Sequence, residues 1–402
     1  MDKTSVRWAV FFANIGHTLT HLMMLLYPTV VLTLEKQLAL SYGQLMWLSV
    51  PGLVLYGFAA LPAGWLGDRW SAEHMMVLFF IGSGIAGIAT GLAQGPLGIA
   101  CGLAAIGFFG AIYHPVGTAW LVRHAENRGR MLGWNGIFGS IGVGAGPIVG
   151  ATLSALYGWR MAFLVPGVIA LLLGGALALL VRGGSVVAAK TDVKPQAEPA
   201  SAEVKRVFAL LSITMLSTGI IFQAFTSVLP KLFEVRLAHL TAGGLVGTGG
   251  MVSLVFALSA AFQFFGGMAA DRFSMKRIYL LCWAIQVPVL FLAVRLFDLP
   301  LFVAALFCFS LTAISTPTEN ALLAHYTPSR WRATAFGAKF LLSLGVSALG
   351  VPLVATVYDR SGDFVWLFAI LAVLAALVAA TALFLPRERR AAPSPVAAAA
   401  AE

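Results

Sequence analysis

Residues 64–69 read Gly-Trp-Leu-Gly-Asp-Arg and close a long apolar stretch, and residues 267–272, Gly-Met-Ala-Ala-Asp-Arg, close another such stretch 203 positions later. A second pair of motifs repeats at nearly the same distance, because His114-Pro115 corresponds to Thr316-Pro317, 202 positions on. In a chain of 402 residues this spacing indicates two similar halves with the same orientation. Each half carries an Asp-Arg turn after its second apolar segment.

The composition predicts a membrane protein. Hydrophobic residues make up 59% of the chain, charged residues only 10%, and the mean hydropathy is +0.89. Soluble domains carry roughly 25% charged residues, and a helix needs about 20 apolar residues to cross a bilayer. We therefore expect an all-α polytopic protein with twelve transmembrane helices, at residues 7–33, 43–66, 74–94, 97–120, 131–156, 160–181, 207–232, 243–270, 276–296, 299–323, 333–358 and 362–385.

The basic residues predict the topology. Most of the 26 Lys and Arg residues fall in segments on the same side as the N-terminus, which by the positive-inside rule places both termini in the cytoplasm. The net charge of +10 thus reports orientation and predicts no nucleic-acid partner. Arg7 precedes an apolar stretch that is too long for a signal peptide, so we expect that stretch to remain as the first span. The expected location is the cell membrane, a bacterial inner membrane, with the lipid bilayer as partner.

The chain divides into four segments. We expect an N-terminal six-helix bundle at 1–181, a flexible cytoplasmic linker at 182–206, a C-terminal six-helix bundle at 207–385, and a disordered cytoplasmic tail at 386–402. The linker mixes Lys, Asp, Glu and Pro with Ala and Ser, a composition that cannot bury a core. The expected oligomeric state is a monomer.

The Gly-x-x-x-Asp-Arg turn resembles the signature loop of the major facilitator superfamily. Glycine lets helices approach closely, Asp can cap a helix N-terminus, and Arg can pair across a bundle. The resemblance implies two six-helix bundles around a midplane cavity, and a cytoplasmic gate formed by both loops and by the arginines after spans four and ten: Gly64, Asp68, Arg69, Arg128, Arg130, Gly267, Asp271, Arg272, Arg330 and Arg332. The first copy departs from the family pattern, because residues 70–74 lack the glycine and the basic pair that usually follow.

Two further stretches resemble branches of the same superfamily. Gly142, Gly146, Pro147 and Gly150 in span five are similar to a motif of its proton-coupled antiporters, although close helix packing alone would also explain them. Many such antiporters have an Arg in span four, and residues 97–120 contain none. Tyr113-His114-Pro115 with Gly117, together with Gly16-His17, resembles the fosmidomycin-resistance-like branch. That resemblance implies export of a small compound, and anionic compounds belong to the implied class.

Two charged residues stand out within the expected spans. Apart from residues at the ends of the expected spans, Glu319 is the only acid that we place in a span, and Lys339 is the only Lys or Arg. A charge in hydrocarbon costs a few kcal/mol or more, so such residues face a cavity or one another. Their similar depth on consecutive helices allows them to pair. Glu319 is then either a proton carrier that also senses substrate, or one half of a static ion pair that fixes two helices.

Three histidines are expected near the cavity. His17 and His21 share one helix face, and the resemblance places both, with His114, near a cavity lined by helices one, four, seven and ten. Gln223 and Thr226 on helix seven and Asn320 on helix ten complete the expected lining, and we count Glu319 and Lys339 among the candidate substrate- or proton-binding residues. Histidine titrates near neutral pH and suits proton coupling. The histidines can also bind a transition metal, or simply hydrogen-bond between helices. Because no carboxylate or thiolate cluster accompanies them, we predict no metal and no cofactor.

The sequence therefore predicts a secondary active transporter that works by alternating access. Our first hypothesis is a proton-coupled antiporter in which Glu319, with His17 or His21, exchanges protons for an outgoing small molecule. The alternative is a proton symporter or facilitator that imports a small organic solute. A third possibility is a non-transporting membrane sensor built on the same fold. We predict no enzyme, because the sequence contains no phosphate-binding Gly-Lys-Ser/Thr loop and no nucleophile-base grouping.

Overall fold

The computed structural model describes residues 3–124, 128–186, 201–327 and 332–386, without the side chains of a few residues at helix ends. Within these ranges, twelve helices or consecutive helical segments are long and apolar enough to cross a membrane. The prediction of an all-α protein with twelve transmembrane helices is therefore confirmed. The tail expected at 386–402 lies almost wholly outside the described residues.

The N-terminal half contains six spans, two of which are interrupted. One of these is formed by α2, α3 and α4 together, and the other by α6, a turn of π-helix η1, and α7. The elements are α1 (Lys3–Leu38), α2 (Tyr42–Trp47), α3 (Val50–Phe58), α4 (Ala60–Arg69), α5 (Ala72–Gly91), α6 (Pro96–Gly110), η1 (Tyr113–Gly117), α7 (Thr118–His124), α8 (Arg128–Tyr157) and α9 (Met161–Arg182).

The C-terminal half repeats this arrangement. Its fifth span is interrupted by a π-helical turn, η3, and a 3-10 turn, η4. The elements are α10 (Ser201–Arg236), α11 (Leu245–Arg272), α12 (Met275–Ala293), α13 (Asp298–Tyr326), α14 (Arg332–Phe340), η3 (Leu341–Gly345), η4 (Val346–Leu349), α15 (Gly350–Ser361) and α16 (Val365–Leu383). Helix α9 ends at Arg182 and α10 begins at Ser201, so helices enter both ends of the segment expected as linker at 182–206.

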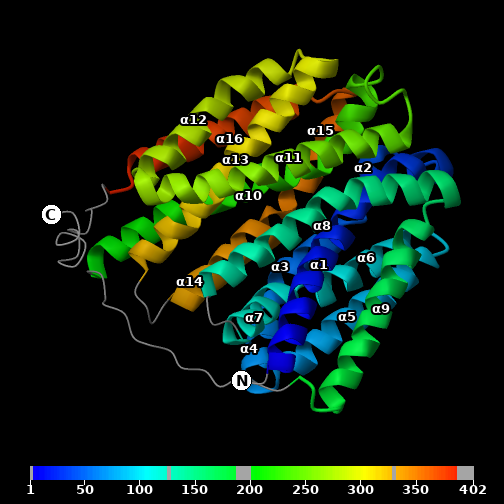
Figure 1. Cartoon of the computed structure of the whole chain (residues 1–402). Coiled ribbons are helices and arrows are strands. Elements are labelled where there is room, and N and C mark those ends of the chain that lie inside the picture. Colours follow the sequence, from blue (N-terminus) through cyan, green and yellow to red (C-terminus); the bar gives the residue numbers. More distant parts are fainter. Residues whose placement is uncertain (1–2, 125–127, 187–200, 328–331, 387–402) are drawn as a thin grey trace.

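The two halves form two groups of helices that meet at one end and separate toward the end that carries both termini (Figure 1). Helices α1 and α5 pack on α8 and α9 in the first half, and α11 and α12 pack on α13 and α16 in the second. Glycines permit the close contacts: a Cβ atom on Gly84 of α5 would lie 2.8 Å from the carbonyl oxygen of Gly167 on α9. Small residues at such crossings are how membrane helices approach one another.

The glycine motif of span five is a packing face of α8 on α1. A Cβ atom on Gly142 would lie 2.2 Å from the carbonyl oxygen of Thr18, and one on Gly146 would lie 2.9 Å from the Leu25 Cβ. The other side of the same helix contacts the C-terminal half, because a Cβ atom on Gly249 would lie 2.7 Å from the Pro147 carbonyl oxygen. Helix α8 therefore joins the first half to the second.

The end remote from the termini is closed by polar contacts between the halves. The Lys231 Nζ atom of α10 lies 2.8 Å from the Glu35 Oε2 atom of α1. The Asp359 carboxylate accepts hydrogen bonds from the Ser41 hydroxyl at 2.6 Å and from the Gly43 backbone N–H at 3.0 Å. Lys231 is only 8% exposed. The expected span ended at residue 232, next to Lys231, but α10 continues to Arg236, so Glu319 and Lys339 are not the only charged pair within helices long enough to span.

Candidate functional site

The first Asp-Arg turn binds its own half. The Asp68 carboxylate accepts a 2.7 Å ionic hydrogen bond from Arg123, and the Arg69 guanidinium lies 4.4 Å from the centre of the Trp65 ring. Gly64 approaches η1 closely, since a Cβ atom there would lie 3.1 Å from the Pro115 Cβ. The loop is thus fastened to the interrupted fourth span at the end that carries the termini.

The second Asp-Arg turn uses a different glycine for its close helix contact. A Cβ atom on Gly267 would meet nothing within 4 Å, whereas one on Gly266 would lie 2.6 Å from the carbonyl oxygen of Ile314 on α13. The close helix approach expected at Gly267 is therefore made by its neighbour, because one residue along a helix turns the contact face by about 100°. Arg272 is exposed. The side chains of Asp271, Arg128, Arg330 and Arg332 lie outside the described residues.

Glu319 and Lys339 form the expected ion pair. The Lys339 Nζ atom lies 2.6 Å from the Glu319 Oε1 atom and also donates to the Asn320 Oδ1 atom at 2.6 Å. The two side chains are 7% and 10% exposed, respectively. Desolvation makes such a pair expensive unless every polar atom is satisfied. The pair joins α13 to α14 inside the C-terminal half.

A tyrosine completes the environment of Glu319. The Tyr279 hydroxyl of α12 donates a 2.6 Å hydrogen bond to the Glu319 Oε2 atom, so each carboxylate oxygen has a short contact. Tyr279 is fully buried. The Thr218 hydroxyl of α10 donates a longer hydrogen bond of 3.5 Å to the same Oε2 atom. The carboxylate thus receives one cationic and two neutral donors from three different helices. Sequence reasoning did not find Tyr279, because an aromatic residue in an apolar span carries no signal of its partner.

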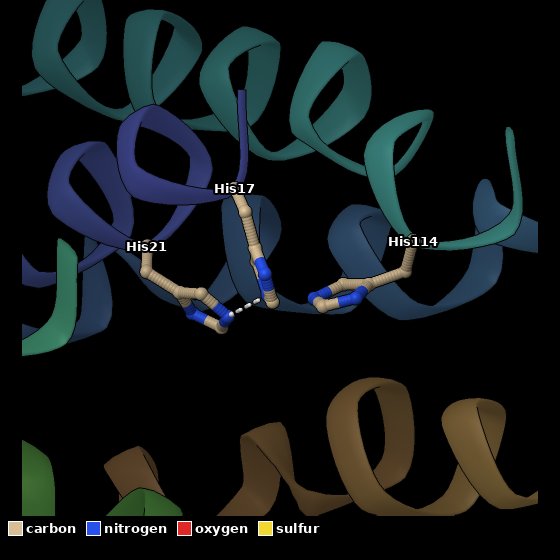
Figure 2. Close-up of side chains that lie close together, drawn as sticks. All are labelled: His17, His21 and His114. Atoms are coloured by element: carbon tan, nitrogen blue, oxygen red, sulfur yellow. Dashed lines mark hydrogen bonds between the residues drawn. The ribbon is translucent and has the colours of Figure 1, made fainter. Parts of the chain in front are cut away.

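His17, His21 and His114 converge. One ring nitrogen from each lies within 4.8 Å of the others, and Figure 2 shows the three rings turned toward one another from α1 and η1. The Nε2 atoms of His17 and His21 are 3.2 Å apart, and the His114 ring lies edge-on to both. All three residues are partly exposed. The predicted proximity of these histidines is therefore present.

A polar network fixes the position of His17. Its Nδ1 atom lies 2.7 Å from the backbone carbonyl oxygen of Asn135 on α8. The Asn135 side-chain amide donates to the Tyr113 hydroxyl at 2.8 Å and to the Asn14 amide oxygen at 3.0 Å. The Tyr113 ring stacks on the His17 ring at a centroid distance of 4.9 Å. Asn135 was missed from the sequence, because a lone amide in span five has no visible partner there.

One contact joins the histidines to the C-terminal half. The Phe340 ring stacks on His114, and Phe340 directly follows Lys339 in α14. The two groups of charged and titratable residues are therefore linked through adjacent positions of a single helix. His114 lies within the π-helical turn η1, and Phe340 immediately precedes the π-helical turn η3. Such turns occur frequently at functional sites in membrane and soluble helices.

A large cavity lies away from the residues that were expected to line the site. A cavity of about 1230 Å³ lies between α8 and α11, in the part of these helices nearer the termini. Its lining is mostly glycine, alanine and large apolar side chains, and Arg130 is its one charged residue. None of the expected lining residues on helices one, four, seven and ten borders it. Helices α8 and α11 are in close contact at Pro147 and Gly249, the cavity is lined by residues of both helices nearer the termini, and α3 packs on η3.

The remaining predicted residues are separated. Gln223, the repeat counterpart of His21, borders a second cavity of about 30 Å³ together with Met24 of α1 and Gly52 of α3. Asn320 instead belongs to the Lys339 contacts. The expected single polar lining is thus divided into a histidine cluster in the first half, an acid–lysine pair in the second, and a glutamine between them.

Comparison with known proteins supports a single family. The sequence profile described as Major Facilitator Superfamily matches residues 10–258 and again residues 244–401. The multidrug resistance protein MdtG of Escherichia coli is 34% identical over 119 residues, and the same-named protein of Erwinia billingiae is 31% identical over 123 residues. An uncharacterized MFS-type transporter of Mycobacterium tuberculosis, Rv1250, is 30% identical over 152 residues. The matched regions span only 29%, 30% and 26% of these relatives.

Solved structures share the fold at low sequence identity. A D-xylose–proton symporter superposes with a TM-score of 0.76 at 14% identity, over 95% of this chain and 98% of that chain. A bacterial homolog of the human lysosomal transporter Spinster, in an inward-facing and occupied conformation, gives a TM-score of 0.75 at 15% identity, over 96% and 95%. These likenesses establish the architecture of two six-helix bundles. The assignment to the fosmidomycin-resistance-like branch stays a prediction.

Proposed function

Because this chain belongs to the Major Facilitator Superfamily, we propose that it is a proton-coupled antiporter that exports an apolar or amphipathic small molecule. The observation that carries the proposal is the buried Glu319–Lys339 pair at 2.6 Å, in a half that moves against the other during alternating access. An intramembrane acid with a named partner is a functional site by default.

Protonation of the Glu319–Lys339 pair can be coupled to a change in structure. Protonation of Glu319 removes the negative charge that holds Lys339, while the Tyr279 hydroxyl remains as a neutral partner for the carboxyl group. Lys339 then keeps the Asn320 amide oxygen, at 2.6 Å, as its contact. Because Phe340 is the next residue and stacks on His114, any shift of α14 is transmitted to the first half.

The cavity supports the class of substrate. Apolar residues such as Ile137, Ile141 and Phe264 line a volume of about 1230 Å³, which is larger than most drug-sized molecules need. The only charged residue of this lining is Arg130, so the lining offers no acidic side chain to a cation. We therefore propose neutral amphipathic substrates. The relatives named as multidrug resistance proteins support export.

The proposed direction of transport, out of the cell, follows from the predicted topology. With both termini in the cytoplasm, the contacts of Lys231 and Asp359 close the outer side, and the cavity between α8 and α11 belongs to the cytoplasmic side. An exporter must accept its substrate in this state. Protonation of Glu319 from outside and deprotonation toward the cytoplasm would then drive the cycle.

The test uses purified full-length protein in liposomes that contain a pH-sensitive dye, with a panel of amphipathic compounds under an imposed proton gradient. We expect compound-dependent proton movement opposite to the compound, and its loss in Glu319→Gln. Glu73→Gln is the matched control, because Glu73 is also buried but accepts hydrogen bonds from Ser71 and Trp120, away from the pair.

The direction of proton movement decides between the candidate functions. Movement of protons and compound in the same direction would establish the symporter instead. Antiport that persists in Glu319→Gln would assign the pair a purely structural role. Compound movement without protons in the wild type would leave a uniporter and overturn the proposed coupling.

A further inference from the structure

We propose that His17, His21 and His114 bind one divalent transition-metal ion of the zinc class. The sequence alone argued against a metal, because no carboxylate or thiolate accompanies these histidines. The structure adds what the sequence could not show, namely that one ring nitrogen from each residue lies within 4.8 Å of the other two. This inference stands on the cluster itself and does not depend on the proposed transport activity.

The spacing of the nitrogens suits a tetrahedral site. Zinc lies about 2.0–2.1 Å from histidine nitrogens, so two ligands of a tetrahedral ion are separated by about 3.3 Å. The Nε2 atoms of His17 and His21 are already 3.2 Å apart. The i, i+4 spacing on α1 sets this edge of the site. A small rotation of the His114 ring toward the pair completes three ligands, and η1 supplies that ring from the facing span.

The protonation of His17 is fixed in the form that binds metal. A backbone carbonyl can only accept, so the 2.7 Å contact to the Asn135 carbonyl oxygen requires the proton on Nδ1. The Nε2 atom of a neutral His17 then presents its lone pair toward His21. A ligating histidine typically donates its second ring N–H to a backbone carbonyl in this manner. The stacked Tyr113 ring holds the imidazole plane in place.

Gly139 of α8 leaves space for the His17 ring because it has no side chain. A Cβ atom on Gly139 of α8 would lie 2.5 Å from the His17 Cε1 atom and 2.6 Å from its Nε2 atom. Any larger residue at position 139 would therefore push the imidazole off its present position. Gly139 thus offers a means of disturbing the site while all three histidines remain.

The chemistry of the ligands selects the ion. Imidazole suits Zn²⁺, Cu²⁺ and Ni²⁺, while Mg²⁺ and Ca²⁺ prefer oxygen. Within the described part of the chain, no acid joins this group as a further ligand. Three neutral histidines leave the fourth position open, as in catalytic rather than structural zinc sites. We infer that water or an anionic group occupies that position.

Cobalt is the probe, because a tetrahedral Co²⁺ complex absorbs strongly in the visible range. The full-length protein is purified through a tag without histidines and titrated with Co²⁺, followed by competition with Zn²⁺. We expect one ion per chain and a tetrahedral spectrum that Zn²⁺ abolishes. His21→Gln and His114→Gln should each weaken binding by more than the roughly 10- to 100-fold that loss of an outer partner costs. Zn²⁺ should also raise the unfolding temperature of the wild type more than that of either of these variants.

The controls separate the cluster from other histidines. His239→Gln and His325→Gln remove exposed histidines outside the cluster and should leave the spectrum unchanged. Gly139→Ala keeps every ligand and should weaken binding by displacing the His17 ring. Failure of the wild type to bind one Co²⁺ per chain, or full binding in the folded His21→Gln, His114→Gln double variant, would overturn the proposal.

Discussion

Phe340 of the C-terminal half stacks on His114 of the N-terminal half, with ring centroids 5.5 Å apart and ring planes inclined by 21°. The neighbouring residue of Phe340 is Lys339, whose ammonium group is bound to Glu319 at 2.6 Å. The interface between the halves therefore touches the buried ion pair through one residue of α14. This arrangement gives protonation of Glu319 a direct mechanical route to the other half.

Phe340→Leu should weaken the observed arrangement of the halves without disturbing the ion pair. An aromatic pair contributes about 0.5–1.5 kcal/mol beyond its buried area, which corresponds to a change of roughly 2- to 12-fold in the ratio of two conformations. Spin labels at Leu132 of α8 and Phe264 of α11, across the cavity, measure that ratio as a distance distribution. Phe163→Leu, within the core of the first half, is the control and should leave the distribution unchanged.

Removing one charge of the ion pair should lower stability more than removing both charges, whereas proton coupling should still be absent when both are removed. Lys339→Met leaves the Glu319 carboxylate buried without its cation, which costs about 3–5 kcal/mol when such a pair is broken. Glu319→Gln combined with Lys339→Met removes both charges and should recover most of that loss, while proton coupling stays absent. Thermal unfolding in detergent measures the first effect and the pH-sensitive dye the second. Substrate-dependent proton movement in the double variant would contradict a carrier role.

The fold could be predicted because its causes are local in the sequence. Apolar length fixes the twelve spans, and the repeat of residues 64–69 at 267–272 gives the two halves. The pairing of Glu319 with Lys339 was predictable for the same reason, since both are costly in hydrocarbon and lie at similar depth. Their uncharged partners were not predictable, because Tyr279 and Asn135 look like ordinary core residues until distant helices are brought together.

The features that the structure places differently from expectation depend on the length, crossing and rotation of helices. Lys231 fell at the end of the expected span 207–232, because span length alone does not show that α10 continues to Arg236. The cavity was expected among the polar residues of helices one, four, seven and ten, whereas the cavity of about 1230 Å³ lies between α8 and α11, which are in close contact at Pro147 and Gly249. Helix rotation likewise decides that Gly266 rather than Gly267 makes the close contact. None of these properties can be derived from spacing along the chain.

Gly43→Ala should open the end remote from the termini. A Cβ atom there would lie 2.3 Å from the Asp359 Oδ2 atom, so the carboxylate must leave the Ser41 hydroxyl and the backbone N–H that it now binds. We expect a cysteine introduced by Ser227→Cys, near the Tyr42 hydroxyl, to react faster with a membrane-impermeant maleimide in this background.

Gly95→Ala is the control for the gate, because a Cβ atom on Gly95 meets nothing within 4 Å and its φ of −174° is accessible to any residue. Equal labelling rates in both backgrounds would show that Asp359 does not hold the halves together. Slower labelling in Gly43→Ala would contradict the gate more directly, since it would mean that the displaced carboxylate had tightened the closure.

Gly142→Ala tests whether the glycine motif of α8 is chiefly a packing face. The new Cβ atom would lie 2.2 Å from the Thr18 carbonyl oxygen, which is backbone and cannot move aside, so α8 must separate from α1. Overpacking of this kind costs about 1–3 kcal/mol. Gly136→Ala on the same helix meets nothing within 4 Å and should be neutral or stabilising by up to about 1 kcal/mol, the usual gain from replacing glycine in a helix. Thermal unfolding distinguishes the two variants. If both retain wild-type stability and Gly142→Ala alone loses proton coupling, the motif acts in transport rather than in packing.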